Sequence, residues 1–190
     1  MKPSIVTSVD GIENPYVKRL LTNVIDLDPM KVLRRTPKRL RKLIKGLKKK
    51  QRRYEPAPGK WSITQIVAHL ADAEVALSWR FRSVLANSGA PVAAYDQDAW
   101  ANNMKYETID ADDSLELFTT LRRANISVLS RLSDDEWDRF GMHAERGKET
   151  VERMATMLAG HDINHLKQIR AIRDIIRGDG NDDPSAPKFL

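Results

Sequence analysis

The sequence predicts an all-α protein: an up-and-down four-helix bundle with one longer crossover and a short additional helix at the N-terminus. Three observations indicate this fold. Helix-start signals recur along the chain, apolar residues follow them at spacings of three and four, and no segment alternates for long enough to form a convincing strand. A chain of 190 residues has the size of one ordinary domain, so it can bury a sufficient core without covalent crosslinks.

The first third of the chain contains two helix starts. Asn14 before Pro15 is expected to cap a short helix, and Asp28 before Pro29 is expected to start the next one. Thr36 before Pro37 is expected to interrupt that second helix. Beyond this point an apolar stripe continues, formed by Leu40, Leu43, Ile44 and Leu47. The stripe predicts a cationic amphipathic helix.

Three longer helices are expected in the remainder. Ser62 and Gln65 form a capping box for a helix that ends at about Asn87, and Asp113 and Glu116 form another for a helix that ends at about Ser133. Residues 89–103 are interpreted as a loop with one short helix. A last helix is expected from near Thr150 to Gly178. The predicted organisation is therefore an N-terminal segment 1–27, a bundle 28–178 and a flexible tail 179–190.

Composition excludes several classes of protein. The chain has no cysteine, so disulfides, thiolate metal ligands and cysteine nucleophiles are absent, which is typical of a reducing cytoplasm. No apolar run approaches the roughly 20 residues of a membrane-spanning helix, and the first residues lack the core of a signal peptide. We therefore expect a cytoplasmic protein without a membrane span.

The net charge of +6 comes from one segment. Residues 31–53 hold thirteen Lys and Arg and no acidic residue, so the rest of the chain is net acidic. Such a segment favours nucleic acid or anionic lipid through counterion release. A solvated helix face that attracts an anionic substrate is the other interpretation, and the near absence of aromatic residues makes nucleic-acid binding the weaker one.

Histidines are the residues with the clearest chemistry. His161 and His165 are one turn apart on the apolar seam of the last helix, so both imidazoles can reach one ion. His69 borders the inner face of an earlier helix and could supply a third ligand. Three neutral imidazoles would leave coordination positions open for water or substrate. The alternative is that each is a core histidine hydrogen-bonded to the backbone.

Two segments of this sequence resemble the DinB-like superfamily of metalloenzymes. One is the run from Lys60 to Leu70 followed by Asp72 and Glu74, and the other runs from Gly160 to Ile169 with its His-Asp-x-x-His-Leu-x-Gln motif. The resemblance covers roughly residues 28–173, and it extends to three intervening features: Tyr106, Arg122 and Gly147-x-x-Thr150.

The resemblance implies a four-helix bundle, commonly a homodimer, with zinc, nickel or a related divalent ion held by three histidines. Residue by residue, these are His69, His161 and His165; manganese and iron are further candidates for the ion. The superfamily includes bacillithiol transferases and other thiol S-transferases as well as metal-dependent hydrolases, so the shared site does not name one reaction.

Catalytic residues are less clearly indicated. Asp72, Asp162 and Asn164 are near the expected ligands and could orient an imidazole or accept a proton, although the interpretation favoured for each is a solvated polar residue. His143 lies in a loop that the resemblance places at the pocket mouth, as acid, base, extra ligand or simply a surface histidine. Four residues are expected either to line the pocket or to pack in the core: Trp100, Tyr106, Arg122 and Asn125.

The resulting hypothesis is a divalent ion that activates water or a low-molecular-weight thiol for hydrolysis or S-transfer on a small molecule. Two alternatives belong to other classes. In one, the ion only ties the helices together; in the other, the basic segment 31–53 binds a polyanion.

Overall fold

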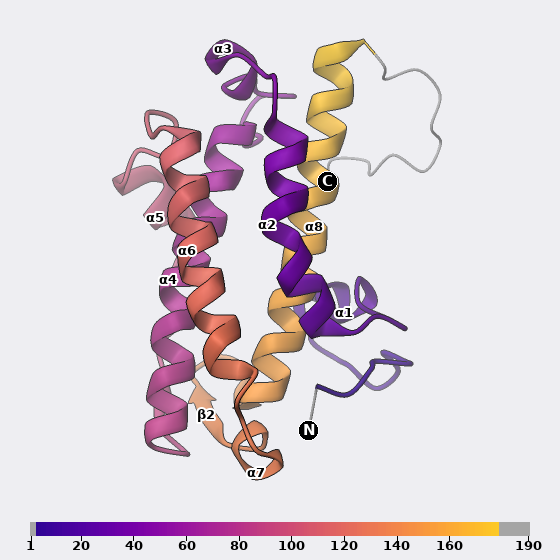
Figure 1. Cartoon of the computed structure of the whole chain (residues 1–190), viewed down its shortest axis with the longest axis vertical. Coiled ribbons are helices and arrows are strands. Elements are labelled where there is room, and N and C mark those ends of the chain that lie inside the picture. Colours follow the sequence, from indigo (N-terminus) through magenta and orange to yellow (C-terminus); the bar gives the residue numbers. More distant parts are fainter. Residues whose placement is uncertain (1–2, 179–190) are drawn as a thin grey trace.

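The computed structural model describes residues 3–178, and four long helices form its body. They are α2 (Pro29–Ile44), α4 (Ile63–Ala86), α6 (Ala111–Leu129) and α8 (Val151–Arg177). Figure 1 shows them side by side, with α2 and α8 running in one direction and α4 and α6 in the other. The long connection between α4 and α6 is the expected crossover, and the predicted all-α bundle is confirmed. The expected tail 179–190 lies outside the described residues.

Shorter elements fill the connections. Four helices are short: α1 (Pro15–Thr22), α3 (Lys49–Arg52), α5 (Gln97–Asn103) and α7 (Asp134–Trp137). Three strands, β1 (Pro91–Val92), β2 (Phe140–His143) and β3 (Gly147–Thr150), form a sheet in that order, parallel between β1 and β2 and antiparallel between β2 and β3. We had expected no strand. Strands of two to four residues are too short to show the alternation on which that expectation relied.

Helix caps follow the sequence signals at four of the expected starts. Asn14, Asp28, Ser62 and Thr150 each accept a hydrogen bond from a backbone N–H of the first turn. The expected start of α6 at Asp113 is wrong. Asp110 is the N-cap, because its carboxylate accepts the N–H of Asp112. The expected end of this helix at Ser133 is also wrong, since Ser133 caps α7 in a capping box with Glu136.

The expected interruption of α2 at Pro37 is wrong as well, because the helix continues to Ile44. Proline has no N–H to donate, so the carbonyl of Leu33, one turn earlier, lacks its usual helical partner. The guanidinium of Arg122 in α6 donates to that oxygen at 3.2 Å. A side chain from a neighbouring helix thus replaces the hydrogen bond that the proline removes.

Arg122 links all four long helices. Its guanidinium donates to Glu74 of α4 at 2.8 and 3.0 Å and to Asp162 of α8 at 2.5 and 3.0 Å, in addition to Leu33 of α2. Arg122 and both carboxylates are almost completely buried. Glu74 also accepts from the amide of Asn125 at 2.9 Å. The network therefore satisfies two buried carboxylates with one arginine and one asparagine.

Helix α1 packs directly on α8 at Gly160. A Cβ atom at this position would lie 2.0 Å from the carbonyl oxygen of Leu20, so only glycine permits the contact. Asn23 reinforces it by donating to the carbonyl of Gly160 at 3.2 Å. The N-terminal helix is thereby held against the bundle, although the expected boundary between segments 1–27 and 28–178 stays a prediction. Within residues 3–178, no helix combines the length and apolar character needed to cross a membrane.

Replacing Arg122 with methionine is expected to lower the free energy of unfolding by about 3–5 kcal/mol, because it leaves Glu74 and Asp162 buried without their cation. Urea denaturation of both proteins measures this difference. Arg123, the exposed neighbour on the same helix, is the matched control: Arg123→Met should change the value by no more than about 0.5 kcal/mol. Equal effects of the two substitutions would contradict the role of Arg122.

Candidate metal centre

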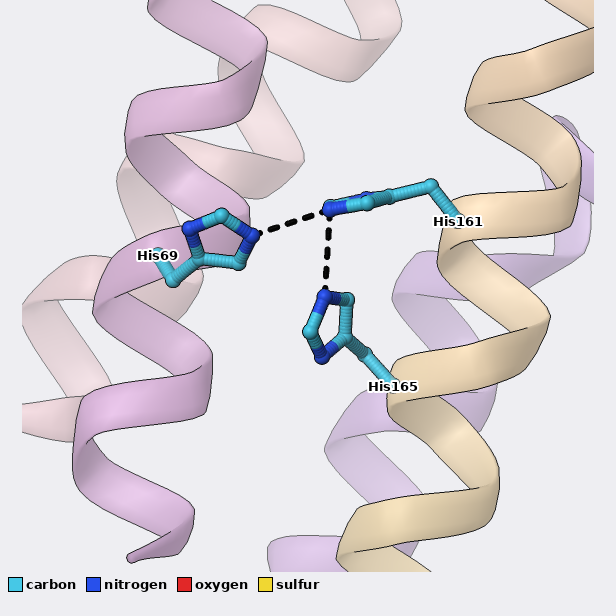
Figure 2. Close-up of side chains that lie close together, drawn as sticks. All are labelled: His69, His161 and His165. Carbon is cyan, nitrogen blue, oxygen red and sulfur yellow. Dashed lines mark hydrogen bonds between the residues drawn. The ribbon is translucent and has the colours of Figure 1, made fainter. Parts of the chain in front are cut away.

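Three histidines meet between α4 and α8. His69 projects from α4, and His161 and His165 project from consecutive turns of α8, so that all three imidazoles point into the space between the helices (Figure 2). Their exposed fractions are 1%, 9% and 7%. The structure therefore brings together the three residues that the sequence pattern and the family resemblance single out.

The ring nitrogens converge closely. The Nε2 atom of His161 lies 2.9 Å from that of His69 and 3.1 Å from that of His165 (Figure 2). Ligands bound to one tetrahedral ion at 2.0–2.1 Å are about 3.3 Å apart. Two of the three nitrogen pairs are thus near the spacing that a shared divalent ion requires, and all three ligand atoms lie within 4.8 Å of one another.

Proton positions favour a cation at the centre. Nδ1 of His165 lies 2.7 Å from Oε1 of Gln168; the amide oxygen only accepts, so this Nδ1 carries the proton and the Nε2 lone pair faces the cluster. The buried Nδ1 atoms of His69 and His161 have no hydrogen-bond partner among the described residues. Hydrogen bonds among the described residues therefore leave some ring nitrogens of this cluster without a partner. A cation would bind all three Nε2 lone pairs at once. The donor set fits a divalent ion.

Burial keeps the imidazoles neutral. It lowers the pKa of His69 to about 3 and that of His165 to about 4. The pKa of His161 falls well below its ordinary value for the same reason, with the neighbouring histidines adding to the effect. Neutral imidazole is the form that binds metal, so the site is ready for an ion at neutral pH without losing protons.

Asp162 and Asp72, two candidate catalytic carboxylates, are already engaged. Asp162 follows His161 directly, but the expectation that it could be solvated is wrong, because it is fully buried and both its oxygens bind Arg122. Asp72 accepts a hydrogen bond from the hydroxyl of Tyr106 at 2.5 Å. The ring of Trp61 packs against both Tyr106 and His69, with ring centres 6.3 and 5.0 Å apart, respectively. Asp72 therefore anchors the aromatic residues beside His69.

His143 lies in the cavity wall. The expectation that His143 lies in a loop is wrong, because this residue ends strand β2. The alternative of a surface histidine is also wrong, because His143 is 3% exposed. Its Nδ1 accepts the N–H of Glu145 at 3.2 Å. Burial, with Arg146 as a second cause, lowers its pKa. Of the three catalytic candidates, His143 is the one that lines the cavity.

The cavity itself has a volume of about 850 Å³, within the range of small-molecule sites. His161 and His165 form part of its wall. Trp100, Tyr106, Arg122 and Asn125, which the sequence suggested as pocket or core residues, are not among the described residues that line it. Several lining residues were missed at the sequence level: Tyr16, Arg80, Tyr95, Arg146 and Glu149. Only Arg80 had a usable signal, because it follows His69 by eleven positions on the same helix face.

Comparison with known proteins identifies the family. A sequence model of the DinB superfamily matches residues 33–169, which include all three histidines. The chain belongs to the DinB superfamily.

Two relatives of this DinB superfamily member carry the name "Putative metal-dependent hydrolase". One, from Oceanobacillus iheyensis, is 28% identical over 59% of this chain and 64% of its own length, just under two thirds of that protein. The other, YfiT from Bacillus subtilis, is 27% identical over 74% of this chain and 79% of its own length.

A solved structure shares the fold. It is described as YfiT from Bacillus subtilis, a probable metal-dependent hydrolase with an unusual four-helix bundle topology. The TM-score is 0.73 at 24% identity, over 79% of this chain and 86% of that one.

The lowered histidine pKa values predict a pH-dependent stability of the metal-free protein. Below about pH 6.5 the unfolded chain protonates its imidazoles, whereas the folded protein resists until the pH approaches 4. The unfolded state then binds more protons, so the free energy of unfolding falls as the pH is lowered through this interval. Urea denaturation of EDTA-treated protein between about pH 7 and pH 4.5 measures the slope. His165→Leu should flatten it, and an unchanged slope in this variant would contradict the assignment.

Proposed function

We propose that this protein is a metal-dependent hydrolase for a small molecule, with a divalent ion held by His69, His161 and His165. The observation that carries the proposal is the convergence of three buried, neutral imidazoles with ligand atoms within 4.8 Å of one another; two of them, His161 and His165, are in the wall of a cavity of about 850 Å³. The names of the relatives support the same reaction class. Zinc and nickel suit three imidazole ligands best, with manganese and iron as further candidates.

The ion would supply a lowered pKa for a bound water molecule and Lewis-acid polarisation of a substrate oxygen. The protein supplies the rest. Gln168 fixes the tautomer of His165, and the Arg122–Asp162 ion pair fixes the part of α8 that carries His161. Apolar residues of α4 and α8 exclude water around the reacting groups. We assign proton transfer at the reacting bond to none of the three candidates: Asp72 and Asp162 already have partners, and His143 lies with Arg80 and Arg146 at the other end of the cavity.

S-transfer from a low-molecular-weight thiol is the second reaction that the same ligands would support, because a coordinated thiol also loses its proton readily. The predicted homodimer and the cytoplasmic location are part of the proposal. Polyanion binding by segment 31–53 is less favoured. Lys49 and Arg52 form ion pairs with Asp110 and Asp112 at 2.8 Å, and Arg53 donates to a backbone carbonyl.

Metal content tests the site. Protein purified without a histidine tag is expected to contain about one divalent ion per chain by plasma mass spectrometry, and His161→Ala should reduce this about tenfold or more, because it removes the central ligand. His143→Ala is the matched control, as it removes a buried histidine outside the cluster and should leave the metal content unchanged. Substoichiometric metal that does not respond to His161→Ala would refute the proposal.

Activity assays test the reaction. Amide and ester substrates, and separately a thiol with an electrophilic acceptor, are supplied to protein that has been treated with EDTA and reloaded with zinc, nickel or manganese. Hydrolysis that EDTA abolishes and one of these ions restores is the expected result. Activity only in the thiol assay would assign S-transfer instead. Silence in both assays despite full metal content would indicate that the ion only ties the helices together.

A further inference from the structure

Arg80 is a buried cation that has no carboxylate partner among the residues that the structure describes. It lies on α4 with an exposed fraction of 9% and lines the same cavity as His161 and His165. One guanidinium nitrogen donates to the carbonyl of Ala93 at 2.5 Å, and the ring of Tyr95 lies 5.5 Å away. Among residues 3–178, no carboxylate lies within ion-pair distance of it. A buried guanidinium normally has an anionic partner, because its desolvation is otherwise uncompensated.

The buried carboxylate that acts electrostatically on Arg80 already has a partner. Glu149 on β3 binds Arg146 through both of its oxygens, at 2.6 and 3.0 Å. Arg146 in turn adds positive potential beside Arg80, and together with burial it lowers the pKa of Arg80. Cations outnumber acids over the whole cavity wall, but Lys60 and Lys167 belong to the histidine end. At the other end Glu149 already neutralises Arg146, so the charge of Arg80 is the one that attracts an anion there.

This region and the histidines lie at different ends of the cavity. Arg80 follows His69 by eleven positions, or three turns of α4, so their Cα atoms are separated by about 16 Å. Because α8 runs antiparallel to α4 (Figure 1), strand β3 with Glu149 also lies at the Arg80 end, twelve positions before His161. The wall between the two ends is apolar: Ala73, Leu77, Met154 and Leu158.

We propose that Arg80, with Arg146 beside it, binds an anionic oxygen group of the substrate, a carboxylate or a phosphate ester, at the end remote from the reacting bond. The guanidinium offers several donors in one plane, the geometry that matches such oxyanions. An apolar segment of the substrate lies against Leu77 and Leu158. Its length is roughly 10 Å, which is the Cα separation of His69 and Arg80 along α4 minus the length of the arginine side chain. The placement of the reacting bond at the histidines rests on the proposed function. Anion binding at Arg80 does not require a metal ion at the histidines.

Calorimetric titration of EDTA-treated protein tests the inference, with octanoate, octyl phosphate and octanamide as probes. Removing the ion ensures that no probe binds to it. In the wild type, at least one of the two anions is expected to bind about tenfold or more tightly than the neutral amide, because the charge-assisted bonds to Arg80 are lost in the amide. The tighter anion identifies the head group. Equal affinity for all three probes would overturn the proposal without any variant.

Variants assign the preference to Arg80. Arg80→Gln should remove the preference for the anion and leave octanamide binding unchanged, whereas Arg80→Lys should retain part of it. Arg123→Gln, which removes an exposed charge outside the cavity, is the matched control and should behave as the wild type. Circular dichroism verifies that each variant is folded. If Arg80→Gln does not fold, the anion preference of Arg80→Lys is used to test the assignment instead. A preference that survives both Arg80 substitutions would refute the assignment.

The two proposals fail in different ways. If the metal site is wrong, metal content is low while anion binding and its dependence on Arg80 persist. If the anion site is wrong, metal content is full while the anions bind no better than the amide.

Discussion

The buried ion-pair network of Arg122 is the constraint on which the rest of the structure depends. One guanidinium contacts α2, α4 and α8 from α6, so the four helices cannot rotate or slide independently. Its desolvation is offset only while both carboxylates and the Leu33 carbonyl stay in place. The network therefore determines which arrangement of the four helices is stable, in addition to contributing to the free energy of unfolding.

The same network determines the position of the histidines. Asp162, held by Arg122, is the residue after His161, and Glu74 lies five positions after His69 on α4. Fixing these carboxylates fixes the rotation of both helices about their axes, which sets where the imidazoles meet. Gln168 then orients one ring, while the packing of Trp61 against His69 supports another. Fold stability and site geometry are thus consequences of one set of contacts.

Charge is distributed unevenly along the cavity between α4 and α8. Neutral, desolvated imidazoles occupy the middle of the bundle, and arginines gather near the small sheet at one end. The sheet matters for this arrangement because β2 and β3 carry His143 and Glu149 into the wall, and the turn between these strands carries Arg146. Helix α1, which packs on Gly160, contributes Tyr16 and Arg19 to the cavity wall.

Periodicity and capping signals determined a good deal from the sequence alone. They predicted the four long helices, most of their starts and the inward placement of His161 and His165, because a helix repeats every 3.6 residues whatever surrounds it. His69 needed the family resemblance as well. Local signals failed where a residue's partner comes from elsewhere in the chain. Pro37 stays helical because Arg122 donates to the Leu33 carbonyl, which the proline leaves without a helical N–H partner.

Only the tertiary structure decided that Asp162 is an ion-pair partner rather than a solvated residue, that His143 is buried, and that Arg80 faces the cavity with no carboxylate partner within residues 3–178. Burial and pairing are properties of contacts between segments 40 to 90 residues apart, and nothing in the local pattern encodes them. The sequence by itself therefore determined which helices form and which faces are apolar. The packing of those helices decided which polar groups lose their water, and hence which of them need a metal, a counter-ion or a substrate.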